Sequence, residues 1–285
     1  MIIVADSGSS KTDWLIECPG SEPQEFRTSG LNPYFLTEKE IIKVIQSQGS
    51  AFVKMAPQVS EVYFFGAGCS SPDRREMVSN ALSHLFSKAF VSVDSDLLGS
   101  AYATCGHAKG FCCVLGTGSN ISYFDGEEIY EGKHGLGFVL GDEGSGSWFG
   151  KVLVTDFLYG NMPKEISDLF YQQYKIDKEL IIKNVYQKPG ANSYLASFTK
   201  FLSEIKSTAY SQEIIKRGLS EFVENCIKTY PDYPDYNCHF VGSIAYHFGD
   251  ELRDICAQSG VHVGKIIKQP IRDLLEFVKA RNNAS

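Results

Sequence analysis

The chain is organised around the segment Asp6-Ser7-Gly8-Ser9-Ser10-Lys11-Thr12-Asp13. Apolar runs at Met1–Ala5 and Trp14–Ile16 flank it, so the pattern predicts a strand, a tight polar turn and a second strand. Gly8 permits a positive φ and close approach to the backbone. Backbone N–H groups beside hydroxyls can hold phosphate oxygens, and Asp6, at a strand end, can reach a magnesium ion directly or through its waters. An ordinary hairpin turn is the alternative, because Ser, Gly and Asp dominate such turns.

Length and composition limit the classes of protein to consider. The chain has 285 residues, 43% of them hydrophobic, and a formal net charge of -7. This is enough for one large domain or two smaller ones, and without a long basic block neither nucleic acid nor a membrane surface is an expected partner. No apolar run reaches transmembrane length, and no basic leader of a secretory signal is seen. The eight cysteines include no Cys-x-x-Cys pair, so we expect buried reduced thiols and a cytoplasmic location.

Strands and helices alternate in the first part of the chain, which favours an α/β architecture. Thr37 and Glu40 have the spacing of a capping box, so a helix is expected to begin there. The predicted strands are Met1–Ala5, Trp14–Ile16, Gln24–Thr28, Glu61–Phe65 and Ala89–Val93, and the predicted helices are Thr37–Ala56, Pro72–Lys88 and Leu97–Cys105.

The pattern starts again at Phe111. A strand, Phe111–Leu115, meets the turn Gly116-Thr117-Gly118-Ser119-Asn120, and strands near Ile121–Phe124 and Glu128–Tyr130 follow. This repeats the opening order of strand and polar turn, so we expect two related half-domains, each presenting a phosphate-holding hairpin to a shared cleft. The predicted boundaries are residues 1–110 and 111–267. Beyond Trp148 the chain is mainly helical, apart from expected strands at Cys238–Val241 and Val261–Ile267.

Three acidic residues, Asp6, Asp96 and Asp142, lie at junctions between predicted elements rather than on helix faces. Asp96 follows a strand and opens a helix, where an Asp is usually an N-cap. The functional alternative is a general base, since a carboxylate near a sugar hydroxyl can take its proton as the oxygen attacks a phosphoryl group.

The segment Gly135–Trp148 is the most unusual in the chain, because glycines surround the adjacent acids Asp142 and Glu143 and a helix follows. Such a loop suits close approach to a ligand. A flexible surface loop is the alternative, but apolar residues within the segment imply packing: Phe138, Val139, Leu140 and Trp148. Gly242-Ser243, between a strand and a helix, either lets an adenine ring lie against the backbone or is a plain turn.

Together these motifs resemble the N-acetylglucosamine kinase and BadF/BadG/BcrA/BcrD-type ATPase family of the actin-like/hexokinase-like ATPase superfamily. Asp6–Thr12 is similar to the first phosphate motif of that family, although Ser7 and Ser10 depart from its usual form. Gly116–Asn120 matches the second phosphate motif, and Val241-Gly242-Ser243 is similar to the adenosine motif. The most specific match is Gly141–Gly146, a signature of the N-acetylhexosamine kinase branch.

The resemblance implies two ribonuclease H-like (actin-like ATPase) domains around an interdomain cleft, with the helix in residues 268–285 returning to the N-terminal domain. It implies transfer of the γ-phosphate of ATP to the 6-hydroxyl of a hexosamine such as N-acetylglucosamine, with a small-molecule sugar as partner. A homodimer is compatible with it. Asp96 would be the base and Asp6 would hold Mg²⁺. The implied sugar-binding residues are Asn32, Gly66, Asp142 and Glu143, and the implied nucleotide-binding residues are Ser9, Lys11, Thr12, Thr117, Gly118, Gly242 and Ser243.

One departure from the family pattern concerns the sugar site. Gly135-Leu136-Gly137-Phe138 stands where the family often has Gly-Trp-Gly followed by His or Pro, so the sugar pocket is expected to differ. Two other functions stay open. The first is a BadF-type ATPase activator, which would need cysteines for an iron–sulfur cluster at a subunit junction. The second is a sensor that binds sugar or nucleotide without turnover.

Overall fold

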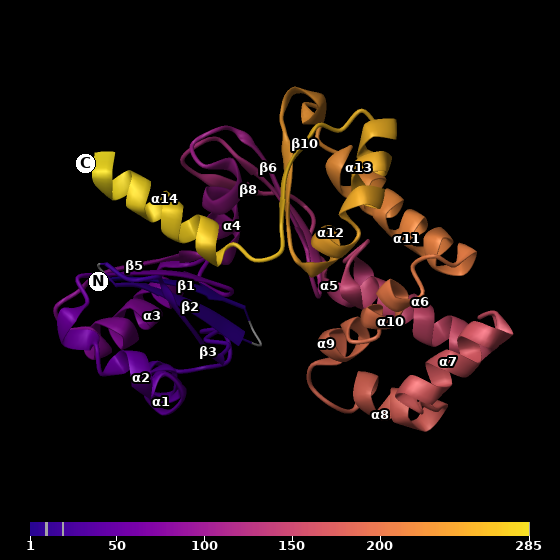
Figure 1. Cartoon of the computed structure of the whole chain (residues 1–285), viewed down its shortest axis with the longest axis horizontal. Coiled ribbons are helices and arrows are strands. Elements are labelled where there is room, and N and C mark those ends of the chain that lie inside the picture. The colour runs from indigo at the N-terminus through magenta and orange to yellow at the C-terminus, as the bar shows by residue number, and fades with distance from the viewer. Residues whose placement is uncertain (9–10, 19, 285) are drawn as a thin grey trace. The chain divides into compact units, whose positions relative to one another are not determined.

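A computed structural model describes residues 1–8, 11–18 and 20–284 and divides the chain into two compact units (Figure 1). Unit 1 consists of Met1–His107, Gly126–Ile129 and Gln269–Ser285. Unit 2 consists of Ala108–Asp125 and Tyr130–Lys268. The chain therefore leaves unit 1 after His107, contributes the short segment Gly126–Ile129 to it, and returns to it at Gln269 once unit 2 is complete.

The sheet of unit 1 has five strands in the order β3-β2-β1-β4-β5. Strands β1, β2 and β3 form an antiparallel meander, while β4 and β5 run parallel to β1. Their bounds are β1 Ile2–Ser7, β2 Lys11–Glu17, β3 Gln24–Ser29, β4 Glu61–Gly66 and β5 Phe90–Ser95. In this register Ser7, Gly66 and Ser95 are aligned at the carboxyl edge of the three parallel strands. Loops that follow these strands start from one edge of the sheet, which is where ligands bind in open α/β sheets.

The helices of unit 1 follow the sequence signals with one correction. The capping box of α1 is confirmed: Thr37 accepts a hydrogen bond from the Glu40 backbone N–H, and Glu40 caps Thr37 in return. The prediction of one continuous helix to Ala56 is wrong, because Gly49 caps α1 and glycine is a poor helix former. The helices are α1 Glu38–Gln48, α2 Ser50–Val53, a 3₁₀ turn Ala56–Gln58, α3 Pro72–Leu85, α4 Asp96–Cys105 and α14 Ile271–Ala284.

Aromatic residues fill the core of unit 1 on one face of its sheet. The ring of Trp14 lies 5.0 Å from that of Phe52, and Phe64 and Phe86 are fully buried beside them. The indole N–H of Trp14 donates to Thr28 Oγ1 at 3.0 Å. Trp14 thus buries its large apolar surface while its polar atom keeps a partner, as a buried tryptophan requires.

The sheet of unit 2 has the order β10-β9-β6-β7-β8. Read from the other edge, this is the strand order of unit 1 with five added to each strand number. Strand β7 is antiparallel to β6, and β9 and β10 run parallel to it, as their counterparts do. The bounds are β6 Gly110–Leu115, β7 Ser119–Phe124, β8 Ile129–Glu131, β9 Cys238–Val241 and β10 Val263–Ile267. The duplicated α/β pattern expected from the sequence is confirmed.

Most of unit 2 is helical, as predicted, and its helices pack around Phe149, Phe170, Phe201 and Phe222. The helix Ala209–Phe222 is followed directly by a π-helical segment, Val223–Ile227. The helices are α5 Gly137–Leu140, α6 Gly146–Tyr159, α7 Lys164–Tyr174, α8 Lys178–Tyr186, α9 Ala191–Ala196, α10 Thr199–Glu204, α11 Ala209–Phe222, α12 Ser243–His247 and α13 Gly249–Gln258, with a 3₁₀ turn at Tyr233–Asp235.

The last helix, α14, packs on α4 within unit 1 (Figure 1). The rings of Phe277 and Tyr102 are stacked, with centroids 4.3 Å apart and an interplanar angle of 12°. An ion pair of 2.8 Å joins Lys279 to Glu17 of β2. Phe277 is only 9% exposed and Leu274 and Val278 are fully buried, so burial of these apolar side chains holds the helix on unit 1.

We predict that Phe277→Ala lowers the free energy of unfolding of unit 1 by about 3 kcal/mol, because it removes a buried ring and leaves a cavity. Phe277→Leu should cost about 1 kcal/mol, since it keeps most of the apolar volume. Urea unfolding followed by Trp14 fluorescence in a Trp148→Phe background reports on unit 1. Equal costs for both substitutions would contradict the packing role.

Candidate active site

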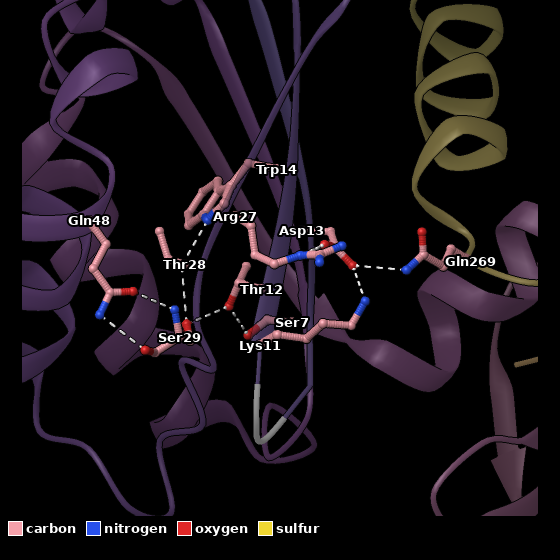
Figure 2. A network of polar contacts seen from close by, with 10 residues as sticks. All are labelled: Ser7, Lys11, Thr12, Asp13, Trp14, Arg27, Thr28, Ser29, Gln48 and Gln269. Atoms are coloured by element: carbon pink, nitrogen blue, oxygen red, sulfur yellow. Dashed lines mark hydrogen bonds and ion pairs between the residues drawn. The ribbon is translucent and has the colours of Figure 1, made fainter. Parts of the chain in front are cut away.

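The first polar turn is held by its own hydroxyl groups (Figure 2). Ser7 Oγ and Thr12 Oγ1 lie 2.8 Å apart, and Thr12 Oγ1 donates to the Ser29 carbonyl at 3.1 Å. The Gly8 N–H donates to the Lys11 carbonyl at 2.9 Å. The predicted nucleotide-binding residue Thr12 is fully buried, so its side chain shapes the hairpin. Ser9, another predicted nucleotide-binding residue, lies outside the described residues.

Asp6 occupies an unfavourable electrostatic position. Burial, followed by the charges of Asp96 and Asp13, raises the pKa of its carboxyl group to about 7, while Lys11 opposes the shift. No hydrogen bond to a described residue satisfies this carboxylate. A partly buried carboxylate near like charges and without a donor favours a bound cation. Among the described residues, no group of three or more His, Cys, Asp or Glu side chains is arranged to hold a metal ion.

Asp13 lies directly opposite Asp6 in the β1–β2 ladder and directly opposite Arg27 in the β2–β3 ladder. Its side chain is engaged by Lys11 and Arg27, each at 2.6 Å, and by the Gln269 amide at 3.5 Å (Figure 2). Neither Asp13 nor Arg27 stands out as a site residue in the sequence alone. The spacing of Lys11 and Asp13 along a strand places them on one face and so indicates their ion pair. The contact of Asp13 with Arg27 cannot be read this way, because it depends on the register between two strands.

Asp96 is the first residue of α4 and not its N-cap, so the N-cap interpretation is wrong. Ser95 is the cap, and its Oγ accepts a hydrogen bond from the Leu98 N–H at 3.2 Å. The Asp96 carboxylate is therefore not needed as the cap, and its charge acts on Asp6. The structure brings Asp6 and Asp96 together at the carboxyl edge of the unit 1 sheet, beside Gly66 at the end of β4.

Asn32 is 7% exposed and lies in the loop after β3. Its Oδ1 accepts a hydrogen bond from the Tyr34 N–H at 2.9 Å. The guanidinium group of Arg74 lies 4.0 Å from the centre of the Tyr34 ring and donates from Nε to the Gly68 carbonyl at 2.7 Å. Arg74 thereby links the loop after β3 to the loop after β4. Neither Tyr34 nor Arg74 was selected from the sequence, because their contact joins two separate loops.

In unit 2 the structure joins the second phosphate turn to the glycine-rich segment. Asp142 Oδ1 accepts from the Ser119 N–H at 3.2 Å, and the Ser147 N–H donates to the Thr117 carbonyl at 2.9 Å. A Cβ atom on Gly118 would lie 2.8 Å from Asp142 Oδ2, so only glycine permits this contact. Three predicted site residues from two motifs therefore lie together: Thr117, Gly118 and Asp142.

Asp142 and Glu143 have different environments. Asp142 is 8% exposed and has a φ of 59°, a left-handed conformation that costs free energy outside glycine and marks functional sites. Burial raises the pKa of its carboxyl group. Glu143 lies at 4.0 Å from Cys226 Sγ, on the π-helical segment, a contact that the sequence did not indicate.

The expected packing of the apolar residues before Asp142 is only partly correct. Trp148 is buried and Phe138 packs on the core of unit 2. Val139 and Leu140, in the short helix α5, are 70% and 76% exposed, and Leu136 is 62% exposed. A helix of one turn can present only part of its surface to the core, which leaves these side chains outside it.

The backbone geometry at position 242 by itself requires glycine. Its φ is 129°, and a Cβ atom there would lie 2.2 Å from the Leu115 carbonyl oxygen. The plain-turn interpretation therefore explains Gly242 without a ligand. Ser243 opens α12 directly after it.

Comparison with known proteins decides the family. No family model and no curated protein matches the chain. A solved structure of a candidate N-acetylglucosamine kinase from Porphyromonas gingivalis is 35% identical, with a TM-score of 0.92, and the alignment covers 100% of both chains. The chain belongs to the N-acetylglucosamine kinase family.

Two more distant structures share the fold. A candidate N-acetylglucosamine kinase from Chromobacterium violaceum is 14% identical, with a TM-score of 0.70 over 97% of this chain and 98% of the other. A ROK family glucokinase from Streptomyces griseus, solved with glucose and AMPPNP, is 14% identical, with a TM-score of 0.57 over 98% of both chains. The chain is thus a sugar kinase with the actin-like ATPase fold, as the resemblance implied.

Two further observations bear on the expected properties of this sugar kinase. All eight cysteines are buried free thiols, as expected. Within the described ranges, no helix combines the length and the apolar character needed to cross a membrane.

We predict that Asp6→Asn stabilises the protein relative to wild type increasingly as pH rises from 4 to 7. In wild type the pKa of the folded Asp6 carboxyl group is raised to about 7 from its ordinary value of 3.8, so the group keeps its proton over most of this range. The folded state therefore binds more protons in this window, and wild-type stability falls as pH rises. The gain should approach about 2–4 kcal/mol above pH 7.

Urea unfolding at pH 4, 5.5 and 8 in EDTA measures this gap. Asp73→Asn, at an exposed carboxylate of the same unit, is the control and should show no such trend. A gap for Asp6→Asn that is constant with pH would rule out a raised pKa.

Proposed function

We propose that this sugar kinase transfers the γ-phosphate of ATP to the 6-hydroxyl of N-acetylglucosamine or a related hexosamine. The observation that carries the proposal is the pair of carboxylates, Asp6 and Asp96, at one edge of the unit 1 sheet. Phosphoryl transfer needs one carboxylate for the metal and another for the acceptor hydroxyl. The family assignment supports the sugar, and the glucokinase bound to glucose and AMPPNP supports ATP as the donor.

Asp96 would act as the general base. Its charge is close enough to Asp6 to raise the pKa of that group, so the two carboxylates belong to one electrostatic site. With the sugar bound so that its 6-hydroxyl lies near Asp96, the carboxylate would accept the hydroxyl proton as the hydroxyl oxygen attacks phosphorus. Asp6 would hold Mg²⁺, which neutralises charge on the phosphate oxygens when bound. With the cation in place, Asp6 stays ionised at neutral pH.

The phosphates and the nucleoside would be held by residues of both polar turns. Lys11 would supply positive charge, and Thr12 would contribute by shaping the first turn. Thr117 and Gly118 would line the second, with Ser9 completing the first and Gly242 and Ser243 facing the nucleoside. Backbone N–H groups in such turns are suited to phosphate oxygens.

The residues proposed to bind the sugar are Asn32, Gly66, Asp142 and Glu143. Asn32 and Asp142 are both buried and oriented by backbone N–H groups, so their positions are fixed in advance of binding. Reduced buried thiols are consistent with a reducing cytoplasm, where we place the enzyme. We infer no nucleic-acid or membrane partner, and a homodimer stays a prediction.

We predict that Asp96→Asn lowers kcat for phosphorylation of N-acetylglucosamine by about 10²–10⁴-fold, because the acceptor hydroxyl loses its base. Binding of ATP and sugar, measured by calorimetry, should change little. Asp94→Asn, two residues earlier on β5, is the matched control and should keep kcat within twofold. A panel of hexoses and hexosamines in a coupled assay identifies the substrate. Turnover of none of them, in an enzyme that binds ATP, would refute the proposed function.

We also predict that Asp142→Asn raises KM for the sugar by about tenfold or more while KM for ATP changes little, since a charged hydrogen-bond partner of the sugar becomes neutral. Asn tolerates the left-handed backbone of this position, so the fold should be kept. Asp168→Asn, at a carboxylate whose side chain is 62% exposed in the same unit, is the control. An increase confined to KM for ATP would assign Asp142 to the nucleotide instead.

A further inference from the structure

Asp13 is a buried carboxylate in a place where the sheet carries alternating charges. It is 8% exposed, and the alternation of β2 puts it on the same face as Lys11. Its cross-strand neighbours on that face are Asp6 and Arg27. The other face of the same strands carries the hydroxyl contacts of Ser7 and Thr12. The charged row is therefore separate from the hydrogen bonds that close the hairpin.

Both oxygens of Asp13 are engaged (Figure 2). Oδ1 accepts from Arg27 Nε at 2.6 Å, and Oδ2 accepts from Lys11 Nζ at 2.6 Å and from Gln269 Nε2 at 3.5 Å. Charge-assisted bonds of this length are the strong ones. Since Arg27 and Gln269 remain when Lys11 is removed, a Lys11 variant does not leave Asp13 as an unpaired buried charge.

The ammonium group of Lys11 has one hydrogen-bond partner among the described residues. Its side chain is 46% exposed, and Asp13 Oδ2 is the one hydrogen-bond acceptor for Nζ among the described residues. An ammonium group has three donors, so two remain for a ligand. An unrestrained lysine would lose about 1.5–2 kcal/mol of side-chain conformational freedom when a ligand orders it. The ion pair with Asp13 has ordered it before any ligand arrives.

We propose that Asp13 is a positioning residue for the nucleotide: it holds the Lys11 ammonium group beside the first phosphate turn, so that its remaining donors meet the triphosphate of ATP without a further ordering cost. This inference rests on the proposed function, which assigns Lys11 to the phosphates. Asp13 itself touches no substrate. Its effect passes through Lys11 and must disappear when Lys11 is absent.

A double-mutant cycle on ATP binding tests this inference. Calorimetry gives Kd for ATP with Mg²⁺ in the absence of sugar for wild type, Asp13→Asn, Lys11→Ala and the double variant. We expect Kd to rise about tenfold for Asp13→Asn and at least as much for Lys11→Ala. The double variant should bind no more weakly than Lys11→Ala alone. In steady-state kinetics, KM for ATP should rise in Asp13→Asn while KM for the sugar stays within twofold.

Glu17→Gln is the matched control, because Glu17 lies on the same strand and pairs with Lys279 at 2.8 Å. It should leave Kd for ATP within twofold of wild type. If Asp13→Asn does not fold, Asp13→Glu replaces it; this variant keeps the charge but displaces it by one methylene group, and it should show the same rise in Kd.

The outcomes distinguish failure of the proposed role of Lys11 from failure of the positioning role of Asp13. If Lys11→Ala leaves Kd for ATP unchanged, the assignment of Lys11 to the phosphates in the proposed function fails. If Lys11→Ala weakens binding but Asp13→Asn does not, the positioning role of Asp13 is overturned. Fully additive losses in the double variant would also overturn it, because they would show that Asp13 acts through the fold and not through Lys11.

Discussion

The accumulation of carboxylates at one edge of the unit 1 sheet is the constraint that the rest of that unit must accommodate. Asp6 lies on β1, Asp13 on β2 and Asp96 directly after β5, and the negative charges of Asp13 and Asp96 repel that of Asp6. Asp13 is neutralised within the protein by Lys11 and Arg27. Asp6 is not, and its raised pKa records that free-energy cost. A fold tolerates such a residue when a ligand stabilises its charge, so the electrostatic imbalance is itself an indication of function.

Unit 2 contributes order of a different kind. Its motifs Gly116–Asn120 and Gly141–Gly146 are joined by hydrogen bonds to the backbone and by the contact of Gly118 with Asp142. The left-handed backbone of Asp142 persists because both of its carboxylate oxygens have partners, Ser119 N–H and Ser147 Oγ. Unit 1 is thus distinguished by the uncompensated charge of Asp6, and unit 2 by the close steric contact of Gly118 with Asp142.

Local signals in the sequence were enough to predict the repeated succession of strands and turns along the chain, because strand alternation and turn residues are local features. They also identified Asp6, Asp96 and Asp142 as unusual by their positions between elements. They missed the partner of Asp13, since Arg27 meets it only through strand register, and the contact of Arg74 with Tyr34, which joins two loops. They overestimated the packing of Val139 and Leu140, because an apolar run does not reveal which face of a short helix is covered. Long-range register and the extent of burial are set by the assembled fold.

The return of the chain at Gln269 has a consequence for synthesis on the ribosome. Unit 1 contains Met1–His107 and Gln269–Ser285, whereas every residue of unit 2 precedes Gln269. Unit 2 can therefore complete its core while the ribosome still holds the last segment. Unit 1 must wait for α14, which follows all of unit 2 in the chain, before Tyr102 gains its partner Phe277. Unit 1 is therefore begun before unit 2 and completed after it. Until α14 is made, the surface of α4, β1 and β2 that it covers stays exposed, and exposed apolar surface of this kind favours aggregation.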